Sequence, residues 1–190
     1  AKVENLSRLV MLTKLDLGSN KICTIEGLET LTALTQLSLE ENEIVHLAGL
    51  SQLRALLELY IGSNCISDTR EVLQLKPLPK LLILDLSGNP LTEADEYRSH
   101  TIYQLRHLRV LDGVGIEDEE RSDAKERFMG KLTLEALGEH LGHQLWEGIT
   151  ELDLSRMKMR EFEALKHEGF RNLRALSLDF NLVTDVESLP

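Results

Sequence analysis

Aliphatic residues recur along this chain at fixed spacings, with polar residues between them. Four segments share the pattern Leu-x-x-Leu-x-Leu-x-x-Asn-x-Ile, with Ile and Leu interchangeable, and they cover residues 12–22, 34–44, 56–66 and 81–91. The first three asparagines are 22 residues apart and the fourth follows after 25, at positions Asn20, Asn42, Asn64 and Asn89. Agreement over so many positions at one period indicates stacked repeats, each a single supersecondary unit.

Each repeat is expected to contribute one short strand to a parallel sheet. Leu15 and Leu17 alternate with outward positions, as in a strand with one buried face. The asparagine that follows can bond the backbone where the chain leaves the strand, so stacked asparagines would form a ladder. One repeat cannot bury its own leucines, so its neighbours must cover them. The pattern predicts an α/β solenoid, a right-handed horseshoe of leucine-rich repeats with its strands on the concave face.

The connections between strands are predicted to be short, because 22 residues leave no room for a full α-helix. The third connection is longer. There Ser67 and Asp68 can cap a helical turn over residues 70–73, and Pro77 and Pro79 would then stop it.

After Asn89 the pattern changes to that of a closing cap. Ile102, Leu105 and Leu108 are three residues apart, which predicts a helix, and residues 108–111 resemble a final strand. We expect this segment to cover the open end of the sheet, since exposed solenoid ends are prone to association.

Beyond the cap, the sequence predicts two helices and a return of the repeat. Residues 117–128 begin with acids and end with bases, which suits a helix dipole, and a second helix is expected to follow Thr133. The repeat resumes at residues 149–159, where Met157 stands in the asparagine position, and at residues 173–183.

We therefore divide the chain into three parts. Residues 1–116 are expected to form a repeat array with a C-terminal cap, residues 117–147 a helical junction, and residues 148–190 the start of a second array. The sequence begins and stops within a repeat, which we interpret as a fragment of a longer array.

The repeats and the cap together resemble a known subclass of repeat proteins. The form Ile-x-x-Ile-x-Gly-Leu at residues 22–28 resembles the protein-phosphatase-regulator subclass, and Tyr97-Arg98 with Leu111-Asp112-Gly113 resembles its C-terminal cap. Nuclear members and an axonemal dynein light chain have a similar cap. Residues 130–137 resemble the junction in cilium-associated proteins that join several capped arrays. The resemblance implies a cytoplasmic, cilium-associated protein, with the nucleus left open.

The formal net charge of −11 bears on the partner more than on the fold. Such a surface repels phosphate, so direct binding of nucleic acid is not expected. A protein partner with a basic surface fits better because opposite charges speed encounter, although the charge can also serve solubility alone. Cys23 and Cys65 do not form a disulfide scaffold, and no apolar run approaches the ~20 residues that span a membrane.

No motif for catalysis or cofactor binding is present. The sequence has no P-loop, no dinucleotide-binding fingerprint and no nucleophile elbow, so we expect neither an enzyme nor a small-molecule substrate, metal or cofactor. His140 and His143 form the one close histidine pair, and without an evident third ligand they are interpreted as surface residues. Carboxylate pairs such as Glu40-Glu41 fit a solvated face better than acid–base chemistry, which needs a cleft.

Strand alternation predicts which side chains line the concave face, and we expect the partner to bind there. The candidate binding residues are Lys14, Asp16, Gln36, Ser38, Glu40, Glu58, Tyr60, Ile83 and Asp85. Tyr60 and Ile83 are the candidate anchors, since tyrosine is favoured at interaction hot spots, and the carboxylates form a rim suited to Lys or Arg. The alternative is that Tyr60 and Ile83 only pair across neighbouring strands.

Two functions are compatible with this pattern. The first is a non-catalytic scaffold that binds a basic protein segment or helix through the concave face. The second is a structural spacer or assembly element of a large ciliary or axonemal complex, using the array ends or the convex side.

Overall fold

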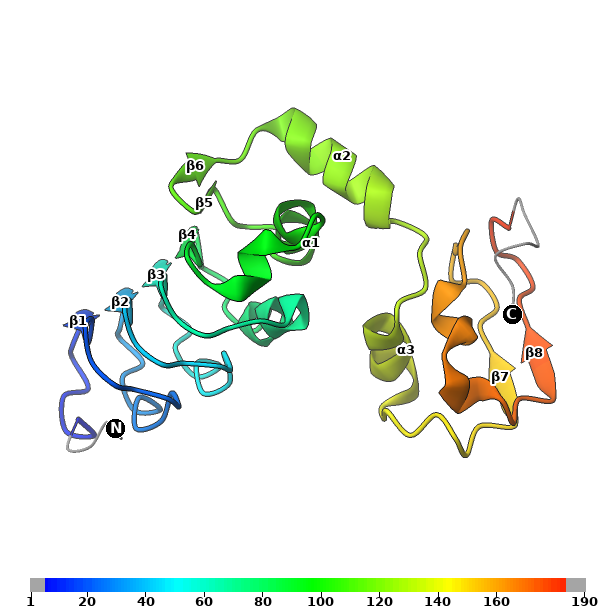
Figure 1. The fold of residues 1–190 in the computed structure, drawn as a ribbon, viewed down its shortest axis with the longest axis horizontal. Coiled ribbons are helices and arrows are strands. Elements are labelled where there is room, and N and C mark those ends of the chain that lie inside the picture. Colours follow the sequence, from blue (N-terminus) through cyan, green and yellow to red (C-terminus); the bar gives the residue numbers. More distant parts are fainter. Residues whose placement is uncertain (1–5, 184–190) are drawn as a thin grey trace. The chain divides into compact units, whose positions relative to one another are not determined.

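The computed structural model describes residues 6–183. Residues 1–5 of the predicted first array and residues 184–190 of the predicted second array lie outside the described residues. The chain forms two compact units, Ala1–Glu126 and Arg127–Pro190, and each has its own hydrophobic core. Figure 1 shows the elements of both units.

The first unit is built on a six-stranded sheet in which sequence order is also spatial order. The first five strands run parallel and the sixth is antiparallel to the fifth. Their bounds are β1 Lys14–Asp16, β2 Gln36–Ser38, β3 Glu58–Tyr60, β4 Ile83–Asp85, β5 Val110–Leu111 and β6 Val114–Gly115. The predicted α/β solenoid of leucine-rich repeats, including its final strand, is confirmed.

Leucines fill the interior of this array in layers, one layer per repeat. The central residues of successive strands, Leu37, Leu59 and Leu84, are fully buried and pair in register. Each layer covers the leucines of the next, because a strand of three residues has too little surface to bury its own side chains. The aliphatic core that the sequence predicted is therefore continuous along the array.

The asparagine ladder joins neighbouring layers by hydrogen bonds. The side-chain oxygen of Asn64 accepts the amide of Ile44 at 2.9 Å, and its nitrogen donates to the carbonyls of Leu39 and Ile61 at 2.9 and 3.0 Å. Asn42 and Asn89 make equivalent bonds. Asn20 is exposed and donates only to carbonyls of its own repeat.

The turn before each ladder asparagine has left-handed backbone. The φ angles are 52° at Ser19, 53° at Glu41, 53° at Ser63 and 71° at Gly88. A side chain other than glycine costs some stability there. The ladder bonds of the next residue hold this conformation in every layer.

The connections from β1 to β2 and from β2 to β3 contain turns and no helix, as predicted. The longer connection from β3 to β4 contains a 3₁₀ helix, η1, Thr69–Leu75, and Asp68 caps it by accepting the amide of Arg70 at 2.9 Å. This confirms the predicted capping role of Asp68. Val72 and Leu75 on this turn are fully buried, so the longer connection adds a layer to the core.

The cap comprises η2 Pro90–Glu93, α1 Tyr97–Gln104, and a hairpin between β5 and β6. The expectation that Leu105 and Leu108 belong to a helix was wrong: both are buried, but α1 ends before them and they lie in the turn that enters β5. Asp112 and Gly113 form the hairpin turn with φ of 52° and 75°, as two-residue hairpins require. The polar helix α2, Asp118–Phe128, follows.

The second unit repeats the same design on a smaller scale. Helix α3, Leu134–Leu141, follows Thr133 as predicted, and Thr133 caps it: its hydroxyl accepts the amide of Ala136 at 3.1 Å. Strands β7, Glu151–Asp153, and β8, Ala175–Ser177, pair in parallel, and short turns η3, Glu163–Lys166, and η4, Glu168–Phe170, lie between them.

A ladder bond is also present here. The amide of Met159 donates to the Asn181 side chain at 3.0 Å, as Ile22 does to Asn42 in the first unit. Trp146 lies on this core, with its ring centroid 5.5 Å from that of Phe170. The backbone of Gly169 approaches Trp146 so closely that a Cβ atom there would lie 2.6 Å from the Cβ of Trp146.

Candidate functional site

The structure brings the predicted binding residues together in two rows across the strands. Register pairing aligns Lys14, Gln36, Glu58 and Ile83 in one row, and Asp16, Ser38, Tyr60 and Asp85 in the other. Neighbouring strands are about 4.8 Å apart, so each row is a contiguous line of side chains. Glu40 follows β2 on the same face by alternation. Sequence reasoning missed Val110, which pairs with Ile83 and extends the first row.

The rows are more buried in β2, β3 and β4 than in β1. Lys14 and Asp16 are exposed, whereas Tyr60, Ile83 and Asp85 are half-buried between their neighbours. A partly buried tyrosine and isoleucine can be covered further by a partner at little cost in side-chain entropy, since their neighbours already restrict them.

Tyr60 lies in an acidic setting. Its hydroxyl donates to a carboxylate oxygen of Glu58 at 3.0 Å. Burial, that hydrogen bond and the charges of Glu58, Glu40 and Asp85 all raise the pKa of Tyr60. The tyrosine is therefore a neutral hydroxyl within a field of carboxylates, a setting that favours a cation from a partner.

A polar hollow of about 300 Å³ lies beside these rows, where the first three strands end. Its lining consists of carboxylates, serines and one glycine: Asp16, Gly18, Ser19, Ser38, Glu40, Glu41 and Ser63. The hydroxyl of Ser19 donates to Glu41 at 2.6 Å, and that of Ser38 to Glu40 at 3.2 Å. Strand alternation could not find Ser19, Glu41 and Ser63, because they lie in the left-handed turns. Their position immediately before a ladder asparagine could have identified them from the sequence.

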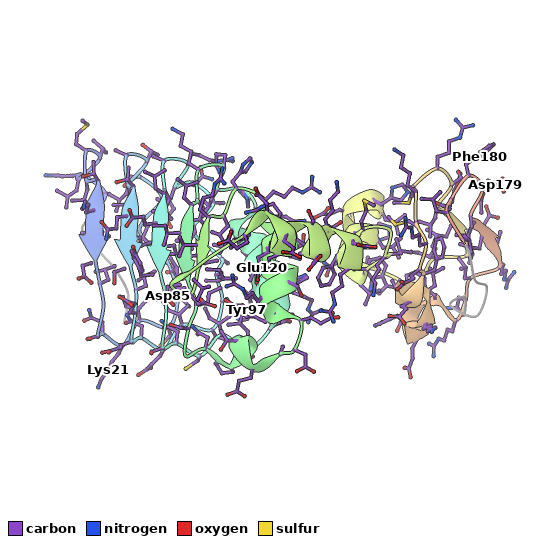
Figure 2. All side chains as sticks on the ribbon, turned by 90° about the horizontal axis from the view of Figure 1, so that it is seen from above. Lys21, Asp85, Tyr97, Glu120, Asp179 and Phe180 are labelled. Atoms are coloured by element: carbon purple, nitrogen blue, oxygen red, sulfur yellow. The ribbon has the colours of Figure 1, made fainter. Side chains whose placement is uncertain are left out.

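The cap fixes the far end of this face through two polar networks. Tyr97 donates to one oxygen of Asp112 at 2.9 Å, and the other oxygen accepts the amide of Leu86 at 2.7 Å. Arg98 makes two bonds to the Glu120 carboxylate, at 2.5 and 2.8 Å, which join α1 to α2. Figure 2 shows Tyr97 and Glu120 at this end of the array.

Burial and charge shift the pKa values in the cap in opposite directions. Burial raises the pKa of Asp112, although its hydrogen bonds from Leu86 and Tyr97 oppose this. The hydrogen bonds from Arg98 lower the pKa of Glu120. Such shifts fit a structural latch, because every polar group involved is occupied by another part of the cap.

Replacing Glu120 by glutamine should remove part of the acid sensitivity of the first unit. A carboxylate whose pKa is lowered by folding stabilises the fold above its unfolded pKa, and this contribution is lost as the pH falls through the folded value. The wild-type midpoint of thermal unfolding should therefore fall more steeply below about pH 4.5 than that of the variant. Circular dichroism melts across the acid range measure both, and parallel curves would contradict the latch.

Within residues 6–183 no group of three or more His, Cys, Asp and Glu side chains is placed to hold a metal ion. Cys23 and Cys65 are exposed free thiols. Among the helices of that same range, none is both long and apolar enough to cross a bilayer.

Parallel three-residue strands, an asparagine ladder and a hydrogen-bonded cap define a leucine-rich repeat solenoid. Residues 1–141 match the family model described as leucine-rich repeat, and the chain belongs to this family. It is 40% identical over 57 residues to U2 small nuclear ribonucleoprotein A' of Arabidopsis thaliana, which is 30% of this chain and 23% of that protein. It is 42% identical over 52 residues to leucine-rich repeat-containing protein 23 of Bos taurus, which is 27% of this chain and 15% of that protein.

A solved structure agrees with this assignment. A chain in the crystal structure of the Drosophila melanogaster SNF/U2A' complex superposes with a TM-score of 0.64 at 25% identity, covering 74% of this chain and 81% of that one. The chain thus spans under a quarter of the length of the curated relatives it matches, but most of this solved chain.

Proposed function

We propose that the first unit is a non-catalytic protein-interaction scaffold whose concave face binds a basic segment of a partner protein. The observation that carries this proposal is the pair of side-chain rows, in which Tyr60 and Ile83 stand among Asp16, Glu58 and Asp85. Across both rows Lys14 is the one cation, and it lies at the β1 end, away from Tyr60. The centre of the face is thus suited to a lysine or arginine flanked by apolar contacts.

The comparisons support a role in protein assembly. The superposed Drosophila chain comes from the crystal structure of the SNF/U2A' complex. A rigid array fits such a role, because a sheet with fixed register presents side chains at constant spacing without ordering on binding. For this chain we propose only the chemical class of the partner, which is a basic protein segment.

The double variant Tyr60→Ala, Glu58→Lys should abolish capture of concave-face partners. It removes the aromatic anchor and places a like charge against a basic partner, and loss of two such contacts weakens binding by about a hundredfold. Affinity capture with the whole chain, quantified by mass spectrometry, measures the change for each protein. The matched control is Glu93→Lys with Glu96→Lys, two exposed carboxylates outside the strand rows. Retention of every partner by the concave variant would disprove the proposal.

A second candidate function is favoured by the β1 end of the array. Leu9, Val10 and Met11 precede β1 and are 47%, 48% and 82% exposed. An assembly element or spacer that stacks on neighbouring repeats would cover them. Fusing one further repeat of the same pattern before β1 should then raise solubility and sharpen unfolding, and no gain from this fusion would count against the proposal.

We also propose the finer identity that the junction suggests. Residues 130–137, leading into the strand at residues 149–154, resemble leucine-rich repeat-containing protein 9, in which several capped arrays are joined. On this proposal, residues 117–147 are a junction between arrays, and the protein is cytoplasmic and associated with cilia. Localisation of the tagged protein in ciliated cells, with cytoplasmic or nuclear signal as the alternatives, tests it.

A further inference from the structure

Parallel strands in register place all segments that enter the sheet along one edge of the array. The segments entering β3, β4 and β5 are residues 50–57, 75–82 and 104–109. They carry five exposed cations, which we call the basic edge: Arg54, Lys76, Lys80, Arg106 and Arg109. None of the three segments contains an aspartate or glutamate.

The opposite edge of the same array, where the chain leaves the strands, has the reverse charge. The segments that leave β2 and β4, residues 39–46 and 86–96, carry six carboxylates: Glu40, Glu41, Glu43, Glu93, Asp95 and Glu96. Neither segment contains a lysine or arginine. A chain of net charge −11 thus concentrates positive charge on a single edge, which points to an anionic partner there.

A leucine-floored hollow opens on the basic edge. Its volume is about 180 Å³, and its lining alternates buried leucines with polar residues: Leu75, Lys76, Leu78, Leu81, Gln104, Leu105, Arg106, His107 and Leu108. This is smaller than the roughly 300–1,000 Å³ of typical small-molecule sites. The space suits one inserted aliphatic side chain, with Lys76, Arg106 and His107 at the rim.

Hydrogen bonds hold both walls of this hollow in place. The turns close through the amide of Leu78 to the carbonyl of Leu75 at 3.0 Å, and that of Leu108 to that of Leu105 at 3.0 Å. Arg121 on α2 donates to the carbonyls of Arg106 and Leu108 at 2.9 and 2.7 Å. The walls are therefore ordered before any ligand arrives, which lowers the entropic cost of binding.

We infer that the basic edge is a second docking surface, which binds an acidic protein segment with one aliphatic side chain inserted in the leucine-floored hollow. The cations match the carboxylates of such a segment, and the leucines match its apolar side chain. An aliphatic anchor distinguishes this ligand from nucleic acid, whose phosphates would leave the leucine floor uncovered. The surface differs in place and in charge from the concave face, so the proposals fail independently.

Fluorescence anisotropy with the whole chain tests the inference. The probe is a labelled peptide in which aspartates and glutamates flank a single central leucine, and its partner probe has serine in place of that leucine. The leucine probe should bind about tenfold more tightly, since burying a leucine contributes about that factor. The double variant Lys76→Glu, Arg106→Glu should bind the leucine probe at least tenfold more weakly than the wild type does. The matched control, Lys125→Glu with Lys166→Glu, reverses two exposed cations outside the basic edge and the strand rows, and should change binding of the leucine probe less than threefold.

Three results would overturn the inference. They are equal binding of the leucine and serine probes, equal effects of the two double variants, and tighter binding of single-stranded RNA or of phosphatidylserine vesicles than of the peptide. Circular dichroism of both variants verifies that they are folded. The concave variant Tyr60→Ala, Glu58→Lys should bind the acidic probe as the wild type does, which separates this surface from the proposed function.

Discussion

Replacing Asn64 by alanine is expected to lower the free energy of unfolding of the first unit by about 2–4 kcal/mol. Its side chain is buried and accepts a hydrogen bond from the amide of Ile44 in the preceding repeat at 2.9 Å. It also donates to the carbonyls of Leu39, Ile61 and Gly62. Alanine would leave a buried amide unpaired and a void between two layers. Urea unfolding followed by far-ultraviolet circular dichroism measures the loss.

The matched control is the same substitution at the first position of the ladder. Asn20 is exposed, and its side chain donates only to Leu17 and Gly18 of its own repeat. Water can replace both bonds, so Asn20→Ala should cost less than about 1 kcal/mol. Equal losses at Asn20 and Asn64 would show that inter-layer bonding is not what the ladder contributes.

The second large effect is expected from Leu59→Ala in the centre of β3. Leu59 is fully buried between Leu37 and Leu84, its register partners in β2 and β4. Buried leucine-to-alanine changes cost about 2–5 kcal/mol, and layers fixed by ladder bonds cannot collapse easily into the void. The loss should therefore lie in the upper half of this range, as measured by urea unfolding.

Leu82→Ala provides the comparison on the same array. Leu82 precedes β4 and is 38% exposed, so its truncation creates no cavity and should cost under about 1 kcal/mol. A loss at Leu59 no larger than that at Leu82 would mean that the array repacks around the change.

The sequence predicted those features that depend on the repeat itself. The alternation around Leu15, Leu37, Leu59 and Leu84 located all four regular strands, because a one-residue shift would expose every leucine. Asp68 was identified as a cap because its short side chain precedes a helical pattern, and a helix was predicted to follow Thr133. These predictions depend on local geometry that repeats from layer to layer.

The features that were missed depend on contacts between segments. The end of α1 at Gln104 is such a case: the spacing of Leu105 and Leu108 is helical, but these residues pack beneath the entry to β5 instead. Val110 was missed because its place in the first row depends on its pairing with Ile83 in the neighbouring strand. The basic edge was missed because the net charge of the whole chain does not show that cations and carboxylates lie on opposite edges of the array.

Trp146 and the three tyrosines give the chain two separate optical signals. The single tryptophan lies in the second unit, against Phe170, whereas Tyr60, Tyr97 and Tyr103 all lie in the first. Excitation at long wavelength, where tyrosine does not absorb, therefore reports the second unit, and tyrosine emission, which lies at shorter wavelength than that of tryptophan, reports the first. The unfolding of each unit can therefore be followed in the intact chain without a label. A difference between the two unfolding temperatures would show directly that one unit unfolds while the other remains folded.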